Sequence, residues 1–320
     1  MDMKATYLKY LWPLLFVLLA LCTACDDDES DFAFHTPIAL SDPFILLHDG
    51  VYYAYGAADA DGIVVYRSSD LKLWKKESTL ALHKDNSYGD RWFWAPQVHY
   101  SEQLKKFFMY YTVNEHLAVA TSDSPLGPFV QEVKQQLLSE KAIDSSFFLD
   151  DDGKAYLYYT KFDNGSEIWI AELYDDLLYL NTGTARRCIR VSQSWEVERG
   201  TVNEAPFVVK HDGRYYMTYS ANEDESAYYG IGYAVSDSPA GPWVKFDENP
   251  ILQKPNGIEG AGHCSMFRDA GGSLKAVLHA HHSPGNYDTR YMYITDVTFT
   301  DGDPAQLVLS KEFQTPRLQY

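Results

Sequence analysis

The feature that most constrains the fold is a short strand motif that occurs five times along the chain. Each copy joins a turn to an alternating or aromatic-rich run, and three copies open with Asp-Gly, a turn typical of β-hairpins. The copies centre on Tyr53, Phe108, Tyr156, Tyr216 and Ala276, which are 48 to 60 residues apart. Such a spacing matches one four-stranded propeller blade. The repeat therefore predicts an all-β, five-bladed β-propeller that forms a single domain.

A second recurring segment follows the hairpins and supports the same architecture. Residues 121–129 read TSDSPLGPF, residues 235–243 read VSDSPAGPW, and residues 67–74 (RSSDLKLW) are a related version. No helical periodicity runs through the repeats. We therefore assign residues 41–320 to the propeller and residues 26–40 to an acidic linker.

Acidic side chains stand at corresponding places in three of the five repeats. Asp42, Asp144 and Glu204 each lie 11 or 12 residues before the central aromatic of their copy. A single acid there could cap a turn, but acids at the entry of a buried strand are costly unless they are paired or functional. Equivalent positions on the inner strands of a propeller converge on its axis. We therefore expect the three acids to share one structural position and to meet around one axial cavity.

Three carboxylates around one cavity suit the hydrolysis of a glycosidic bond. One carboxyl protonates the leaving oxygen while a second acts from the opposite side of the sugar. A third negative charge nearby raises the pKa of the acid and keeps it protonated near neutral pH. The net charge of −18 excludes nucleic acid as a partner and disfavours an anionic polymer. The expected partner is a neutral oligosaccharide or polysaccharide.

The first 25 residues predict a targeting segment. A basic start precedes a 12-residue apolar run at 11–22, which is too short to span a bilayer and suits a signal peptide. Cys25 follows two small residues and precedes an acidic run, an arrangement that resembles a bacterial lipoprotein signal. The resemblance implies a lipid anchor on Cys25 at the outer membrane or cell surface of a Gram-negative bacterium. A periplasmic location or plain secretion is the alternative.

The segments around the three acids resemble those of glycoside hydrolase family 43, a five-bladed family of β-xylosidases, α-L-arabinofuranosidases and arabinanases. The resemblance runs from about Asp42 to Gly302. It implies that Asp42 in SDP is the general base and that Glu204 in NEAP is the general acid. Asp144 in AIDS would raise the pKa of the acid and orient it. The resemblance also implies inversion at the anomeric carbon, for which the two catalytic carboxyls should lie about 6.5–9.5 Å apart.

Three further residues match substrate-binding positions of the family. Trp94 belongs to a WAP segment that is expected near the pocket, and Arg290 matches an arginine that pairs with Asp144 and reaches the substrate. His263 matches a central histidine that faces the channel, and the resemblance implies a structural calcium ion near it, although catalysis requires no cofactor. His279 and His281 alternate on one strand but lack partners at ligand spacing, so no zinc site is predicted.

The predicted function is an exo-acting, inverting hydrolase that releases α-L-arabinofuranose or β-D-xylose from plant-type polysaccharides or their oligosaccharides. The alternatives are an endo-acting arabinanase and a carbohydrate-binding propeller without catalysis. A fructan-active, retaining relative is disfavoured because SDPF stands at 41–44 where Asn-Asp-Pro-Asn is usual. The chain is expected to be a monomer, and the sequence leaves open whether Cys188 and Cys264 pair.

Overall fold

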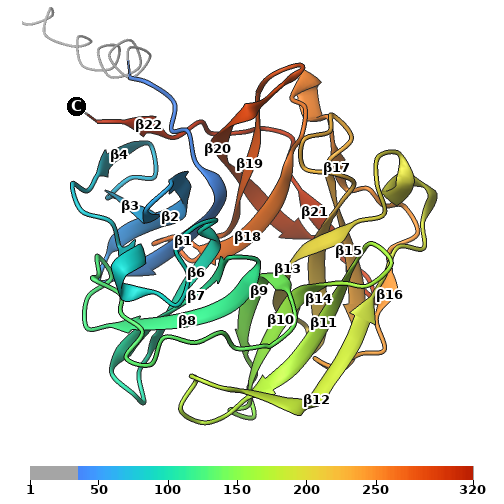
Figure 1. Ribbon diagram of the computed structural model, residues 1–320. Helices are drawn as coiled ribbons and strands as arrows, with labels where there is room; N and C mark the ends of the chain where they lie inside the picture. Colours follow the sequence, from blue (N-terminus) through green and yellow to red (C-terminus); the bar gives the residue numbers. More distant parts are fainter. Residues whose placement is uncertain (1–34, 320) are drawn as a thin grey trace, which may run out of the picture. The chain divides into compact units, whose positions relative to one another are not determined.

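The computed structural model describes residues 35–319 and contains five sheets, one for each blade (Figure 1). Each sheet is antiparallel and folds from one consecutive stretch of chain, except that a C-terminal strand joins the first sheet in parallel. The helices among the described residues are three short 3-10 turns at Lys84–Asn86, Ser194–Val197 and Pro255–Gly257. The all-β, five-bladed β-propeller is therefore confirmed. The predicted signal peptide and Cys25 lie outside the described residues. Within residues 35–319 no helix is long and apolar enough to cross a bilayer.

Each blade is an antiparallel meander that begins with its innermost strand. Blade one contains β1 (Ser41–His48), β2 (Val51–Asp59), β3 (Gly62–Ser68), β4 (Leu73–Lys76) and β5 (Leu82–His83). Blade two contains β6 (Trp94–Ser101), β7 (Lys106–Val113) and β8 (His116–Ser122). Blade three contains β9 (Ala142–Leu149), β10 (Ala155–Phe162), β11 (Ser166–Leu173) and β12 (Leu180–Ile189). Blade four contains β13 (Asn203–His211), β14 (Arg214–Ala221), β15 (Gly230–Ser236), β16 (Val244–Lys245) and β17 (Leu252–Gln253). Blade five contains β18 (Gly262–Arg268), β19 (Leu274–Ser283), β20 (Asn286–Phe299) and β21 (Leu307–Leu309).

The innermost strands β1, β6, β9, β13 and β18 contact one another in a closed ring (Figure 1). All five strands begin at the same end of this ring, because every blade repeats the same antiparallel order. Side chains at the starts of these strands therefore gather at one end of the axis, as the repeat predicts.

The apolar core lies between neighbouring blades, and the strand alternation explains the abundance of aromatic residues. Successive side chains of a strand face opposite sides. On β10, Leu157 and Tyr159 pack toward blade two, whereas Tyr156 and Tyr158 pack toward blade four. Large rings therefore pack into both interfaces of this blade, where they bury apolar surface. Both Cys188 and Cys264 are free, so no disulfide joins them.

The second recurring segment accepts hydrogen bonds from buried tyrosines of the preceding blade. The hydroxyl of Tyr55 in blade one donates to the carbonyl of Pro125 at 2.6 Å. The hydroxyl of Tyr158 in blade three donates to the carbonyl of Pro239 at the same distance. A buried phenol needs a partner, so these turns allow tyrosines to pack between blades.

Two short segments join blade five to blade one. The amide of Leu40 donates to the carbonyl of Arg290 at 3.0 Å, and the amide of Met292 donates to the carbonyl of Ile38 at 3.0 Å. After blade five the chain returns as β22 (Arg317–Leu318), which pairs in parallel with β4 of blade one. The ring is therefore closed twice: the segment before β1 bonds to blade five, and the segment after blade five bonds to blade one.

Candidate active site

Each innermost strand begins with a β-bulge whose second residue has a left-handed backbone. These residues are Asp42 (φ 51°), Ala95 (φ 45°), Asp144 (φ 56°), Ala205 (φ 51°) and His263 (φ 49°), each inside a register shift of its strand pair. Residues other than glycine adopt this conformation at a cost and need surrounding structure to hold them. The bulges therefore form five matching sites at one end of the axis.

Glu204 does not occupy the position of Asp42 and Asp144, so the predicted common register of the three acids is wrong. The left-handed residue of blade four is Ala205, and Glu204 precedes it. Glu204 corresponds instead to Trp94 of blade two, because both pair with the matching residue of the second strand. Between equivalent cross-strand pairs the hairpin of blade three is one residue longer than those of blades one and four, and counting through that hairpin hid the offset. The equivalent pairs are Leu46–Tyr53, Phe148–Tyr156 and Val209–Tyr216.

Asp42 is buried among basic side chains of blade five. Its Oδ1 lies 3.3 Å from His263 Nδ1, 3.3 Å from His279 Nδ1 and 3.8 Å from Arg290 Nη1. Burial alone raises the pKa of Asp42, but these three neighbours outweigh it and hold the pKa well below its usual value. Asp42 is therefore an ionised carboxylate that can accept a proton.

Glu204 has the opposite surroundings. Removal of its carboxyl from water raises the pKa of Glu204 well above its usual value, and the charges of Asp144 and Asp224 add to the rise. The Tyr229 hydroxyl, which donates to Glu204 Oε1 at 2.8 Å, favours the ionised form but does not cancel these effects. Glu204 therefore keeps its proton under conditions in which Asp42 has lost its own.

Asp144 links the two acids electrostatically and touches the backbone beside one of them. Burial raises the pKa of Asp144 to about 6, with His263 lowering it and Asp42 raising it. Asp144 Oδ2 accepts a hydrogen bond of 3.2 Å from the amide of Ala205, the residue that follows Glu204. The three predicted catalytic acids therefore lie close enough to influence one another's protonation, as the sequence predicts.

The amides of the left-handed residues are bound by side chains of the preceding blade. The pairs are Asp42 N with His279 Nδ1 (3.1 Å), Asp144 N with Thr112 Oγ1 (3.1 Å), and His263 N with Ser220 Oγ (2.8 Å). The three accepting residues occupy the same register position on their second strands. This repeated contact holds each bulge in place.

In blade four the amide of the left-handed residue, Ala205, donates to a carboxylate instead of a hydroxyl. Thr160 of blade three occupies the matching register position, yet Asp144 takes the Ala205 amide instead. Within the described residues the buried Thr160 hydroxyl has no hydrogen-bond partner. Asp144 therefore does two things: it fixes the backbone beside Glu204 and it places a negative charge there.

Comparison with known proteins agrees with this geometry. Residues 35–304 match the model of glycosyl hydrolases family 43. The chain belongs to glycosyl hydrolase family 43.

Several relatives of this family 43 chain cover most of its length. It is 27% identical to the beta-D-galactofuranosidase xynD of Aspergillus niger, over 75% of this chain and 73% of that protein. It is 26% identical to an arabinoxylan arabinofuranohydrolase of Paenibacillus polymyxa, over 71% of this chain but only 42% of that protein. The crystal structure of an endo-1,4-beta-xylanase from Bacteroides thetaiotaomicron superimposes with a TM-score of 0.85 at 43% identity, covering 90% of this chain and 99% of that one.

The predicted substrate-binding residues His263 and Arg290 both lie beside Asp42, but the predicted partner of Arg290 is wrong. Within the described residues Arg290 forms ion pairs with Asp224 Oδ2 at 2.8 Å and with Asp42, and none with Asp144. Arg290 lies on blade five, which adjoins blades one and four, whereas Asp144 belongs to blade three.

Trp94 lies at the start of β6, at the same end of the axis as the acids. Its ring stacks on Trp92 with centroids 5.8 Å apart and an angle of 21°. The Arg91 guanidinium lies 4.3 Å from the centroid of the Trp92 ring, which is itself exposed. Blade two of the family 43 chain therefore presents an aromatic wall where blade four presents its acid.

Sequence reasoning missed three side chains of the site. Tyr229 and Asp224 belong to the loop between β14 and β15 and carry no recognisable pattern. The sequence analysis assigned no role in the site to His279, although this side chain contacts both the amide and the carboxylate of Asp42. Burial lowers the pKa of His279 to about 4, so its ring is neutral near pH 7. The register position that it shares with Thr112 and Ser220 is the signal that could have identified it.

The residues around His263 do not by themselves fit a calcium ion. Calcium takes six to eight oxygen ligands, whereas Nδ1 of His263 faces Asp42. In residues 35–319 no three His, Cys, Asp or Glu side chains are gathered so that they could hold a metal ion. An ion there would have to draw most of its ligands from water, and no catalytic step below depends on one.

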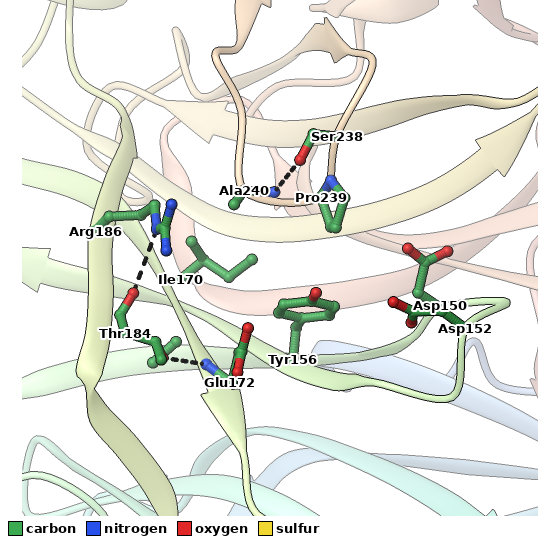
Figure 2. Close-up of a pocket in the computed structure, with 11 residues that line it drawn as sticks. Asp150, Asp152, Tyr156, Ile170, Glu172, Thr184, Arg186, Ser238, Pro239 and Ala240 are labelled. Atoms are coloured by element: carbon green, nitrogen blue, oxygen red, sulfur yellow. Dashed lines mark hydrogen bonds between the residues drawn. The ribbon is translucent and has the colours of Figure 1, made fainter.

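A pocket of about 230 Å³ lies between blades three and four, apart from the acids (Figure 2). Tyr156, Glu172 and Arg186 line it together with the turn at 238–240. Polar groups there are already joined to one another, as in the bond of 2.9 Å from the Glu172 amide to Thr184 Oγ1. None of the predicted site residues reaches this pocket.

Proposed function

We propose that this family 43 glycosidase is an inverting, exo-acting hydrolase that releases α-L-arabinofuranose or β-D-xylose from neutral plant-type polysaccharides or their oligosaccharides. The observation that carries the proposal is that Asp42 and Glu204, at one end of the axis, have neighbours that shift their pKa values in opposite directions. Such a pair supplies a base and an acid at the same pH. Relatives named for arabinoxylan and xylan support a pentose-containing substrate.

The geometry assigns one role to each acid. Glu204 gives its proton to the glycosidic oxygen as the bond from that oxygen to the anomeric carbon breaks. Asp42 removes a proton from a water molecule whose oxygen bonds to the same carbon from the opposite face. Glu204 is left ionised and Asp42 protonated, and exchange with solvent restores both. Asp144 keeps Glu204 protonated before the reaction and holds the Ala205 amide.

The stereochemical outcome tests this assignment. Inversion requires a gap of about 6.5–9.5 Å between the two carboxyls, so that a water molecule fits between base and sugar. Proton NMR of the first product formed from an aryl pentoside should show the anomer opposite to that of the substrate. Retention of configuration would overturn the inverting mechanism. Absence of turnover on aryl α-L-arabinofuranosides and β-D-xylosides would favour a non-catalytic binding protein.

The role of Glu204 is tested by changing the leaving group. Glu204→Ala should lower kcat/KM by about 10²–10⁴-fold on natural linkages, because their leaving oxygen needs a proton. The loss should be much smaller on aryl glycosides whose phenolate leaves unaided. Glu248→Ala, which removes an exposed glutamate of the same blade outside the site, is the control and should behave as wild type. Equal losses on both substrate classes would remove Glu204 from the role of acid.

Endo action is a second candidate, because two similar solved structures are enzymes of that kind. One is the xylanase above, and the other is an endo-arabinase from Bacteroides thetaiotaomicron at 28% identity, with a TM-score of 0.69, covering 84% of this chain and 99% of that one. Digestion of linear arabinan, arabinoxylan, xylo-oligosaccharides and arabinogalactan separates the two. An exo enzyme yields monosaccharide from the first minutes, whereas an endo enzyme yields a ladder of oligosaccharides.

The lipoprotein-type leader completes the proposal. Lipidation of Cys25 would hold the enzyme at a membrane surface as a monomer that faces its polymeric substrate. Membrane fractionation of cells that express the full chain, compared with Cys25→Ser, tests the anchor. A variant that stays with the membrane after this change would contradict it.

A further inference from the structure

A groove of about 830 Å³ lies between blades two and three, at the ends of the strands opposite the acids. Its walls come from the β6–β7 turn, the β9–β10 turn and the loop that follows β11. Asp144 and Leu149 lie on the same strand, five residues or about 17 Å apart. The groove is therefore separate from the catalytic cavity.

The walls of the groove combine ring faces with amide and hydroxyl groups. The aromatic residues that line it are Tyr100, Phe108, Tyr110, Phe147 and Tyr174. Phe108 and Tyr110 are buried and form the base of the groove, whereas Tyr174 is exposed and offers its ring to the C–H face of a sugar. Ser101, Gln103 and Asn181 can exchange hydrogen bonds with the hydroxyl groups of the sugar. The groove has the size of a small-molecule site, and about half of its lining surface is polar, as suits a ligand rich in hydroxyl groups.

Tyr174 is the most open of these rings. It is 53% exposed, and Leu149 in the same groove is 58% exposed. Within residues 35–319 the Tyr174 side chain has no hydrogen bond and no stacking partner, while its backbone is fixed by the bond of 3.0 Å from its amide to the carbonyl of Tyr179. A large ring held in water on an ordered loop is preorganised to bind a ligand at little entropic cost.

The charges of the groove select against acidic ligands. Four carboxylates and one ammonium group line it: Glu102, Asp152, Glu172, Asp175 and Lys154. A uronic-acid polymer or a phosphate would be repelled here, and so would a second copy of this acidic chain. A neutral chain of sugars fits both the rings and the charge.

We propose that this groove is a second carbohydrate-binding site, which holds a stretch of neutral polysaccharide away from the point of cleavage. The identity of the sugar rests on the proposed function, whereas the site itself does not. Binding at two places on one polymer raises the effective concentration of substrate at the catalytic cavity without any new catalytic contact.

Retention in native gels that contain arabinoxylan or linear arabinan measures polymer binding directly. The full chain carrying Glu204→Gln is used as the reference, so that the polymer is not consumed. Adding Tyr174→Ala should weaken retention by about fivefold or more, as expected for a central aromatic contact. Leu149→Lys, which extends a charged chain into the groove, should weaken retention to a similar extent.

Tyr179→Ala is the matched control. Tyr179 is 43% exposed and lies on the same loop, but it lines a neighbouring cavity of about 420 Å³ instead of the groove. This variant should be retained like the reference. Unchanged retention in both Tyr174→Ala and Leu149→Lys, or equal losses in Tyr174→Ala and Tyr179→Ala, would overturn the proposal. Sedimentation as a dimer that Tyr174→Ala converts to a monomer would make the groove a protein interface instead.

Kinetics of the active chain separate this inference from the proposed function. With Glu204 intact, Tyr174→Ala should leave kcat/KM on aryl pentosides unchanged and raise KM on the polymer by about fivefold. If Tyr174→Ala hydrolyses the polymer with an unaltered KM, the second binding site is contradicted and the proposed hydrolase activity is not. If the polymer retains the protein in the gel but is not hydrolysed by the active chain, the proposed hydrolase activity is contradicted and the second binding site is not.

Discussion

Asp42 and Glu204 both lie at the start of an innermost strand and are both withdrawn from solvent, yet their neighbours push their pKa values in opposite directions. Asp42 faces His263 and Arg290, and its pKa falls. Glu204 faces Asp144 and Asp224, and its pKa rises. Since burial raises both pKa values, the sign of the neighbouring charges decides the difference. The propeller places the acids, and the charged side chains around each acid give it its role.

The largest effect should follow from removing the base. Asp42→Asn should lower kcat/KM by about 10²–10⁴-fold on activated and natural substrates alike, because the attacking water needs a base whatever the leaving group. This uniform loss contrasts with the selective loss in Glu204→Ala. If the loss in Asp42→Asn depended on the leaving group, the assignment of Asp42 as the base would be contradicted.

Stability gives an independent check on Asp42. Its folded-state pKa lies below the unfolded value of 3.8, so the ionised carboxylate stabilises the fold above about pH 4, and this contribution fades as the pH falls further. Thermal unfolding of Asp42→Asn should therefore show a deficit against wild type at pH 7 that shrinks toward pH 3.

A smaller effect is expected when the acid loses its negative neighbour. Asp144→Asn removes a charge that raises the pKa of Glu204, so Glu204 should lose its proton at lower pH. The basic limb of the kcat/KM profile should therefore move to lower pH, and activity at pH 8 should fall more than activity at pH 5. Asp150→Asn, in the hairpin of the same blade and paired with Lys210, is the control and should leave this limb in place. An unmoved limb in Asp144→Asn would show that Asp144 only positions the backbone.

The smallest effect concerns the two matching hydroxyls. Thr112→Val removes the acceptor of the Asp144 amide and should cost about 1–2 kcal/mol of stability. That loss corresponds to a Tm decrease of roughly 2–4 °C for each kcal/mol. Thr160→Val replaces a hydroxyl without a partner and should change Tm little or raise it. Equal losses in calorimetry would mean that Thr160 has a partner after all.

The repeat was enough to predict the five blades and the meeting of the three acids, because both follow from local spacing. It was not enough to place Glu204 correctly, since one extra residue in the hairpin of blade three shifted the count. The partner of Arg290 depends on which blades adjoin around the ring, and Asp224 and Tyr229 come from a loop without periodicity. Such contacts join residues far apart in the chain, so spacing alone does not reveal them.

The junction between blades five and one has a consequence for when the protein becomes active. Asp42 is made early in translation, but the histidines and the arginine that keep it ionised are made last and reach it across that junction. A nascent chain that has completed four blades already carries its proton donor, yet its base still lacks the blade-five side chains that lower its pKa. Hydrolysis should therefore switch on when the ring shuts, and a protease cut that frees residues 37–40 from β20 should silence the enzyme before the remaining blades unfold.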